Sequence, residues 1–173
     1  MSEELSFDNL GIKENLLRGV YSYGFEKPSK IQFKSIPVIN ERKDIIAQSQ
    51  SGTGKTGAFT IGSLNIVNED LNKTQILIVN PTRELAEQTM NVIHEISSYT
   101  KITKSKAVGG TNVNACSESL RREPHVVVGT PGRIMDMINK RCLITSEVTT
   151  LVIDEADEML SFGFLPTLQE IIR

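Results

Sequence analysis

Short runs of β-branched apolar residues alternate along the chain with segments of helical periodicity. Four such runs cover Asp44–Gln48, Gln75–Asn80, Val126–Gly129 and Leu151–Asp154. Uninterrupted runs of this kind are typical of strands that are buried on both faces of a parallel sheet. Ile102–Val108 alternates more weakly and is a further candidate strand. The pattern predicts an α/β fold with right-handed crossovers and a functional site at the carboxyl ends of the strands.

Helical segments separate these strands and also precede the first of them. The clearest covers about Arg83–Ser98, where apolar side chains recur near one face. Ahead of the first strand, about Ile12–Tyr23 predicts a helix that ends at Gly24. A second helix is expected to begin after Pro28 and to weaken at Pro37. No repeat, low-complexity tract or linker is evident, so we expect one compact unit.

Composition narrows the class of protein. The 173 residues are 39% hydrophobic and 23% charged, an ordinary globular balance. No apolar run approaches the roughly 20 residues that cross a bilayer, and the polar, acidic start resembles no targeting signal. These features favour an intracellular globular domain.

The net charge, the cysteines and the histidines do not indicate a functional site by themselves. The net charge of -2 argues against nucleic-acid binding through bulk positive charge but leaves room for a local basic groove. Cys116 and Cys142 lack metal-ligand spacing, so we expect idle or buried thiols in a reducing compartment. His94 and His125 are isolated, and structural roles are expected for both.

The strongest chemical motif lies between a predicted strand and a predicted helix. It consists of Ser49, Gln50, Ser51, Gly52, Thr53, Gly54, Lys55 and Thr56. Small residues here let successive backbone N–H groups turn around phosphate oxygens. Lys55 can reach the β- and γ-phosphates, and the Thr56 hydroxyl suits a Mg²⁺ ion. Ser49 stands where the strict phosphate-loop pattern has glycine. The Lys-Thr pair disfavours the alternative of a plain connecting turn.

Two carboxylates follow the last predicted strand. Asp154 can hold the Mg²⁺ shell, while Glu155 can orient and deprotonate an attacking water molecule. Alone, such a pair would more often be a solvated helix start. Together with Lys55 and Thr56, the pair favours phosphoryl-transfer chemistry.

The tetrad Asp154-Glu155-Ala156-Asp157 resembles the signature of the DEAD-box RNA helicases. Further motifs of the family occur in the expected order. Residues 24–32 resemble the adenine-reading Q motif, with Phe7 as its upstream aromatic residue. Residues 81–86 match motif Ia, residues 109–110 match the GG element, and residues 130–133 match motif Ib. The resemblance extends from Phe7 to beyond Phe164 and is greatest to the initiation-factor-4A branch. It implies a three-layer RecA-like phosphate-loop NTPase domain with a mainly parallel sheet. We divide the chain into a Q-motif helical segment, residues 1–40, and the RecA-like part, residues 41–173.

The resemblance implies a role for each motif. Gln32 would pair with adenine, Phe25 would stack on the base or pack in the core, and Ser29 would support the purine edge. Catalysis would rest on Lys55, Asp154 and Glu155, with ATP and Mg²⁺ as cofactors and Thr56 and Asp154 on the metal. Backbone contacts to single-stranded RNA would come from Pro81, Thr82, Arg83, Gly109, Gly110, Thr130, Gly132 and Arg133. Without the resemblance, these last residues would be read as turn and helix-start chemistry.

The chain stops before the Ser-Ala-Thr motif that the resemblance leads us to expect next. In the sheet order of the family, that missing strand separates the phosphate-loop strand from the Asp154 strand. We therefore expect a fragment that is truncated at its carboxyl end, with a gap or looseness in its sheet at that position. A second RecA-like domain, with its arginine fingers, would be the partner that completes the enzyme.

The function expected of the longer protein is RNA-dependent ATP hydrolysis coupled to local duplex unwinding, first of all in translation initiation. A monomer in the cytoplasm or the nucleus is expected, with a scaffold protein of the initiation-complex type as a further partner and no membrane. A non-catalytic, nucleotide-responsive platform for RNA or a scaffold is the main alternative. A phosphate-loop NTPase acting on DNA or a small molecule is disfavoured by Gln32 and the intact motif Ia.

Overall fold

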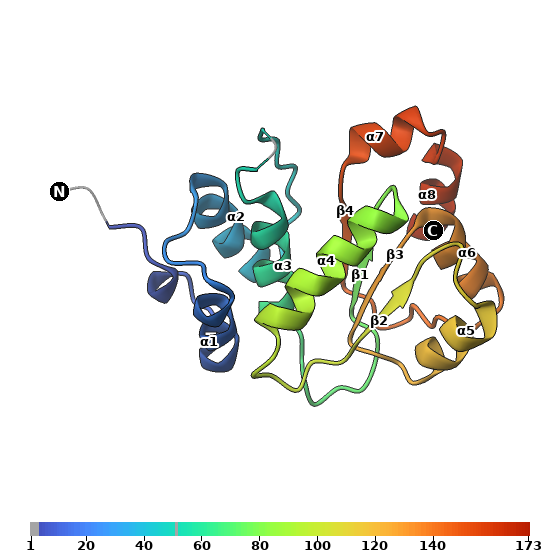
Figure 1. Cartoon of the computed structure of the whole chain (residues 1–173), viewed down its shortest axis with the longest axis horizontal. Helices are drawn as coiled ribbons and strands as arrows, with labels where there is room; N and C mark the ends of the chain where they lie inside the picture. The colour runs from blue at the N-terminus through green and yellow to red at the C-terminus, as the bar shows by residue number, and fades with distance from the viewer. Residues whose placement is uncertain (1–3, 51) are drawn as a thin grey trace. The chain divides into compact units, whose positions relative to one another are not determined.

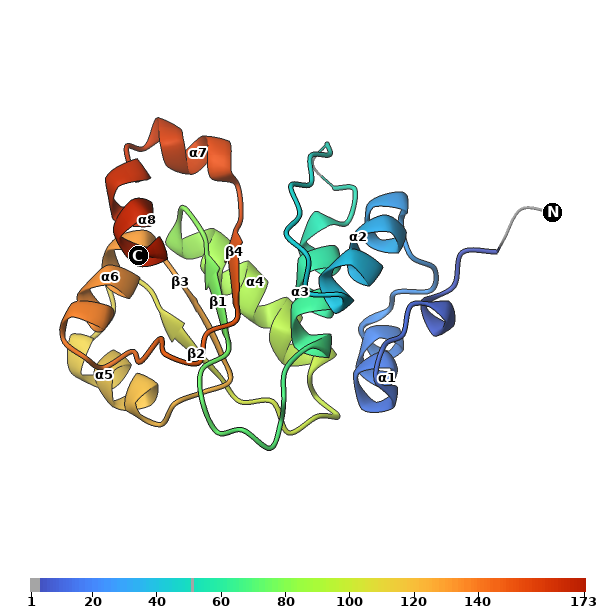
Figure 2. The same ribbon diagram turned by 180° about the vertical axis from the view of Figure 1, so that it is seen from behind.

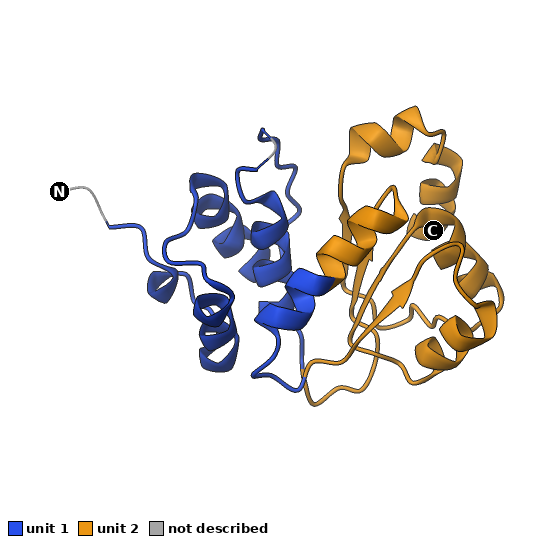
Figure 3. Cartoon of the chain, in the orientation of Figure 1, with its two compact units in different colours: residues 1–68, 91–101 blue, residues 69–90, 102–173 orange. Residues whose placement is uncertain are grey.

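The structure is a computed structural model that describes residues 4–50 and 52–173 (Figure 1). The chain forms two compact units, residues 1–68 with 91–101 and residues 69–90 with 102–173 (Figure 3). The long helix α4, Arg83–Ile96, is divided between them. The predicted boundary between the Q-motif segment, residues 1–40, and the RecA-like part, residues 41–173, is not tested by these units and stays a prediction.

The first unit is helical in its described part. It contains the short 3-10 helix η1 (Phe7–Asn9) and the helices α1 (Glu14–Tyr23), α2 (Lys30–Asn40) and α3 (Lys55–Asn65). The predicted end of α1 is confirmed, because Gly24 adopts a left-handed conformation with φ of 108°. Pro37 was expected to weaken α2, but the helix continues to Asn40. The missing N–H of one proline is tolerated where buried Gln32, Ser35 and Ile36 anchor the helix and α2 packs extensively on α3.

The buried side chain of Asn65 joins three helices of this unit. Its amide oxygen accepts the backbone N–H of Lys13 at 2.8 Å, and its amide nitrogen donates to Asn40 Oδ1 at 2.9 Å. Nearby, α1 approaches the end of α4 so closely that a Cβ atom on Gly19 would collide with the carbonyl oxygen of Ile96. Glycine at this position is therefore required by packing.

The second unit is built on a parallel sheet. Its strands are β1 (Ile76–Val79), β2 (Lys104–Ala107), β3 (Val126–Gly129) and β4 (Thr150–Ile153), in the order β2-β3-β1-β4. The helices that follow them are α5 (Val113–Arg121), α6 (Pro131–Asn139), α7 (Ala156–Ser161) and α8 (Leu165–Ile172). The predicted α/β class with a parallel sheet is confirmed.

Helices cover this sheet. Leu77, Val79 and Val127 of the strands belong to a core cluster with buried residues of α5, α6, α7 and α8, among them Leu120, Ile134, Met137, Met159 and Leu168. The part of α4 that belongs to this unit, residues 83–90, lies in front of the strands in Figure 1 and behind them in the reverse view of Figure 2. All residues of β1 and β3 are buried, which explains their unbroken apolar sequences.

The prediction of a strand at Asp44–Gln48 is wrong. These residues form no strand and are exposed, and the side chain of Ile46 is fully so at 101%. A parallel strand needs a neighbour to satisfy its backbone groups, so an apolar run without one does not form a strand. The expected gap between that predicted strand and β4 is not tested, because only one of the two strands is present. Among the described strands none pairs with β4 on its other side, and the residues of β4 are only half-buried.

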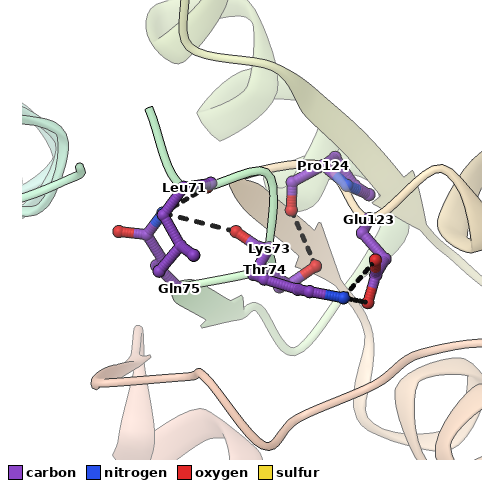
Figure 4. A network of polar contacts seen from close by, with 6 residues as sticks. All are labelled: Leu71, Lys73, Thr74, Gln75, Glu123 and Pro124. Atoms are coloured by element: carbon purple, nitrogen blue, oxygen red, sulfur yellow. Dashed lines mark hydrogen bonds and ion pairs between the residues drawn. The ribbon is translucent and has the colours of Figure 1, made fainter. Parts of the chain in front are cut away.

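A polar network closes the amino-terminal end of the sheet (Figure 4). Lys73 pairs with Glu123 at 2.7 Å, and the Thr74 hydroxyl donates to the carbonyl oxygen of Pro124 at 2.7 Å. Gln75 donates to the carbonyl oxygen of Leu71 at 2.9 Å. The network holds the segment before β1 against the loop before β3, at the end of the strands opposite to their carboxyl ends.

His125 lies beside this network and is buried, as its expected structural role requires. Its Nδ1 atom accepts the backbone N–H of Thr103 at 3.0 Å, which places the ring proton on Nε2. Burial lowers the pKa of His125, and the charge of Glu69 with the carbonyl groups of Leu71 and Glu69 opposes this only in part. The folded protein therefore favours the neutral ring.

We predict that the free energy of unfolding decreases as the pH falls from about 8 to about 5.5. The stability from neutral His125 is fully present above the unfolded pKa of 6.5 and is lost as the pH falls toward the lower folded pKa. His125→Asn keeps an acceptor for Thr103 and should flatten this dependence in urea unfolding. His94→Asn, at an exposed position of α4, should preserve it. An equal pH dependence in wild type and His125→Asn would contradict the assignment.

Candidate functional site

The carboxyl ends of the four strands align along one edge of the sheet. The register pairs Val79 with Gly129 and Ile153, and Ala107 with Gly129. The residues that follow the strands are therefore level with one another. Along this edge come Gly109-Gly110 after β2, Thr130 after β3, Pro81-Thr82 after β1 and Asp154-Glu155 after β4. The predicted motifs Ia and Ib, the GG element and the start of the tetrad at 154–157 thus lie in one row, as expected for a site in a parallel α/β sheet.

The glycine turn after β2 is tied to the start of α6. Thr130 accepts the backbone N–H of Gly109 through its hydroxyl oxygen at 3.1 Å. Arg133 donates to the hydroxyl of Thr111 at 3.0 Å and to its carbonyl oxygen at 2.9 Å. Gly110 has φ of 78°, a conformation that favours glycine. The guanidinium of Arg133 thus holds this turn, and an additional contact of Arg133 with RNA stays a prediction.

The turn between β1 and α4 presents motif Ia. Pro81 is buried, and the Thr82 hydroxyl accepts the backbone N–H of Leu85 at 3.2 Å at the start of the helix. Arg83 is exposed, and its Nη1 atom lies 3.4 Å from where a Cβ atom of Gly110 would be. An exposed guanidinium beside a glycine turn and a helix start is an arrangement that can hold a phosphate group.

The carboxylates occupy the end of the row at β4. Asp154 donates its backbone N–H to the carbonyl oxygen of Val79 at 3.0 Å, and its Oδ2 atom accepts from Asn80 Nδ2, also at 3.0 Å. Glu155 begins α7 with φ of 52°, a left-handed conformation that costs about 1–2 kcal/mol for a residue other than glycine. Both side chains are half-buried.

A Mg²⁺ ion fits this donor set only as part of a complex with phosphate. Among the described residues, no group of three or more His, Cys, Asp or Glu side chains could enclose a metal ion. Mg²⁺ commonly uses one or two protein ligands and completes its shell with substrate phosphates and water. The single carboxylate Asp154 suits that mode of binding.

The phosphate-loop motif lies in the first unit. Gly52 and Gly54 adopt φ of 78° and 94°, and Lys55 is the first residue of α3. The Thr53 hydroxyl donates to the carbonyl oxygen of Gln50 at 2.6 Å, and its oxygen lies 2.7 Å from Ser49 Oγ, within hydrogen-bond distance. The loop therefore has the glycine conformations that turn a chain into a helix start. Lys55 and Thr56 lie in the first turn of α3, and Ser51 lies outside the described residues.

The Q motif packs against this loop. Ser29 and Gln32 form a reciprocal capping box at the start of α2, and Gln32 Nε2 donates to the carbonyl oxygen of Gly54 at 3.2 Å. A Cβ atom on Gly57 would lie 2.6 Å from Gln32 Nε2 and 3.0 Å from the ring of Phe25, so glycine permits this close approach. Gln32 is thus engaged by protein groups, and its contact with adenine stays a prediction.

Phe7 braces the Q motif, as expected. Its side chain is fully buried, and its ring centre lies 6.1 Å from that of Phe25. Phe25 itself is half-buried and also contacts Tyr23, with ring centres 4.9 Å apart. The Phe25 ring is therefore a packing residue of this segment, and stacking on a base stays a prediction.

Comparisons with known proteins agree with these motifs. The family model described as DEAD/DEAH box helicase matches residues 29–173. The chain belongs to the DEAD/DEAH box helicase family. Among curated relatives of this family, "ATP-dependent RNA helicase eIF4A" of Candida albicans is 48% identical over 167 residues, which are 96% of this chain and 42% of that protein. The chain thus spans less than half the length of this DEAD-box relative.

Solved DEAD-box structures have the same fold. A DEAD box protein of Methanococcus jannaschii matches with a TM-score of 0.91 and 37% identity, covering 96% of this chain and 46% of the other. Dbp5 of S. cerevisiae, bound to RNA and ADP BeF3, matches with a TM-score of 0.83 and 39% identity, covering 90% and 39%. The expected RecA-like DEAD-box fold is confirmed.

Two residues in the row along the carboxyl edge of the sheet were not predicted from the sequence. Asn80 holds the Asp154 carboxylate, and Thr111 receives the guanidinium of Arg133. A polar residue that ends an apolar run, as Asn80 does, was the available signal for the first. Nothing in the spacing indicates the second, because the Thr111–Arg133 contact joins turns that follow different strands.

Proposed function

We propose that this chain is the ATP-binding, RNA-contacting domain of an ATP-dependent RNA helicase. The observation that carries the proposal is the row of motifs Ia and Ib, the GG element and Asp154-Glu155 along one sheet edge. The similarity to eIF4A supports a role in translation initiation, and the Dbp5 structure supports the use of a nucleotide and RNA by this fold.

In this proposal, the first unit supplies the groups that recognise ATP. Backbone N–H groups at the start of α3 and the Lys55 ammonium would bind the phosphates, and Thr56 would be a ligand of Mg²⁺. Phe25, Ser29 and Gln32 would recognise adenine. The contact of Gln32 with Gly54 supports a role in which base recognition and the phosphate loop influence each other.

The second unit would supply the catalytic carboxylates. Asp154 would bind Mg²⁺ through its shell of water, and Glu155 would orient the attacking water molecule and accept its proton. Bound Mg²⁺ would neutralise charge that develops on the phosphates. The left-handed backbone at Glu155 supports this role, because such strain is concentrated at functional sites.

Single-stranded RNA would bind along the same row through its phosphates. Helix starts at α4 and α6, the Gly109-Gly110 turn and the exposed Arg83 offer N–H groups and one positive charge. These groups contact backbone rather than bases, so little sequence preference is expected. A few such contacts are compatible with a net charge of -2.

In the longer protein, a second RecA-like domain would close on ATP and RNA, bend the bound strand and contribute the arginines that stabilise the γ-phosphoryl group. Such arginines accelerate phosphoryl transfer by roughly 10³–10⁵. A scaffold protein would organise the domains, and the protein would act as a monomer in the cytoplasm, with the nucleus as the second location. In the described part of the chain, no helix is both long and apolar enough to span a bilayer.

We predict that the chain binds a fluorescent ATP analogue weakly in the presence of Mg²⁺. Lys55→Ala should weaken binding by about tenfold or more, because a hydrogen bond to a charged group contributes about 1.5–3 kcal/mol. Lys34→Ala, at an exposed position of α2, is the matched control.

Gln32→Ala should reduce the preference for adenine over guanine nucleotides. This preference is a ratio of two affinities, so a uniform loss of folded protein does not change it. Equal binding of both bases by the unaltered chain would refute the proposed base recognition.

Measurements of ATP hydrolysis distinguish the helicase from the alternative of a nucleotide-responsive platform. Residues 1–173 alone should show negligible RNA-stimulated ATP hydrolysis, and robust turnover would contradict the need for a second domain. In the longer protein, Glu155→Gln should trap ATP and RNA, because the general base is lost while both ligands still bind. An unchanged phenotype of that variant would favour the platform.

A further inference from the structure

Asn80 occupies the junction of four elements at the functional edge of the sheet. It is the first residue after β1, and its side chain is completely buried. Its backbone N–H donates to the carbonyl oxygen of Gly129 at the end of β3, at 2.8 Å. Its side-chain nitrogen donates to Asp154 Oδ2 at 3.0 Å and to Thr89 Oγ1 of α4 at 3.3 Å. The residue thus connects the ends of β1, β3 and β4 with α4.

The direction of the Asn80 amide is fixed by its neighbours. With the amide reversed, its carbonyl oxygen would face the Asp154 carboxylate, and two acceptors would repel each other. In the observed direction, both amide hydrogens have acceptors, whereas Oδ1 is buried without a partner among the described residues. A buried unpaired acceptor costs about 1–3 kcal/mol. Packing alone does not account for such a group, and its amide donates to the charged side chain of Asp154.

We infer that Asn80 is a positioning residue for the Asp154 carboxylate. Holding Oδ2 restricts rotation of the carboxyl group, so that Asp154 is oriented before Mg²⁺ and nucleotide arrive. Asn80 also directly precedes Pro81, the first residue of the proposed RNA-binding turn. The same side chain therefore links that turn to the proposed metal ligand. The inference rests on the proposed function, because it assigns the purpose of orienting Asp154 to metal binding.

Thr89 offers a matched control for the inference. It is also buried, and its hydroxyl oxygen accepts the other amide hydrogen of Asn80 at 3.3 Å. Thr89→Val removes this hydroxyl and preserves the shape of the side chain. It perturbs the same buried cluster while the bond from Asn80 to Asp154 remains.

The test compares the affinity of the chain for a fluorescent ATP analogue with Mg²⁺ and with EDTA. The ratio of the two affinities measures the contribution of the metal. We expect Asn80→Ala and the smaller change Asn80→Ser to reduce this ratio about fivefold or more, since the lost bond is to a charged group. Thr89→Val should retain the ratio of the unaltered chain. Thermal unfolding of each variant establishes the folded fraction.

The outcomes separate this inference from the proposed function. A ratio in Asn80→Ser and Asn80→Ala equal to that of the unaltered chain would overturn the inference alone. Equal losses in both Asn80 variants and Thr89→Val, in proportion to lost stability, would likewise overturn it in favour of a structural role. An unaltered chain that binds nucleotide with no dependence on Mg²⁺ would overturn the proposed function and the inference together.

Discussion

The parallel register of four strands determines where the chemistry of the second unit lies. Because β2, β3, β1 and β4 run in the same direction and end level with one another, residues far apart in sequence are brought into one row. The backbone bonds from Asn80 to Gly129 and from Asp154 to Val79 maintain that alignment past the last paired residues. A displacement of one strand would move a whole motif out of the row.

Much of this arrangement could be predicted from the sequence, because its determinants are local. The runs at 75–80 and 126–129 are buried on both faces, so their composition alone indicates strands. Gly24 marks the end of α1 through its own backbone conformation, and the helix expected after Pro28 begins at Lys30. The motifs on turns could be placed once those strands were known.

The features that were not predicted from the sequence depend on contacts between residues far apart in the chain. Asp44–Gln48 has the composition of a strand, but strand formation depends on a neighbour, which no local pattern specifies. The contact from Asn80 to Asp154 joins residues that are 74 positions apart, and that from Arg133 to Thr111 joins residues 22 positions apart. The family resemblance implies that Arg133 contacts RNA, which stays a prediction, whereas the bonds of its guanidinium to the turn at Thr111 were not predicted. Such pairings become visible only when the strand order is known.

The proposed function depends most on contacts between the carboxyl edge of the sheet and the backbone of single-stranded RNA. Chemical-shift mapping of the isotope-labelled chain with single-stranded oligouridine and oligoadenosine tests it most directly. We expect changes centred on the amides of Gly109, Gly110, Gly132 and Arg133, similar for both oligonucleotides and weaker at higher salt. The amides of Lys73 and Glu123, at the opposite end of the strands, should not change. Changes centred on that opposite end, or changes with one base sequence alone, would contradict it.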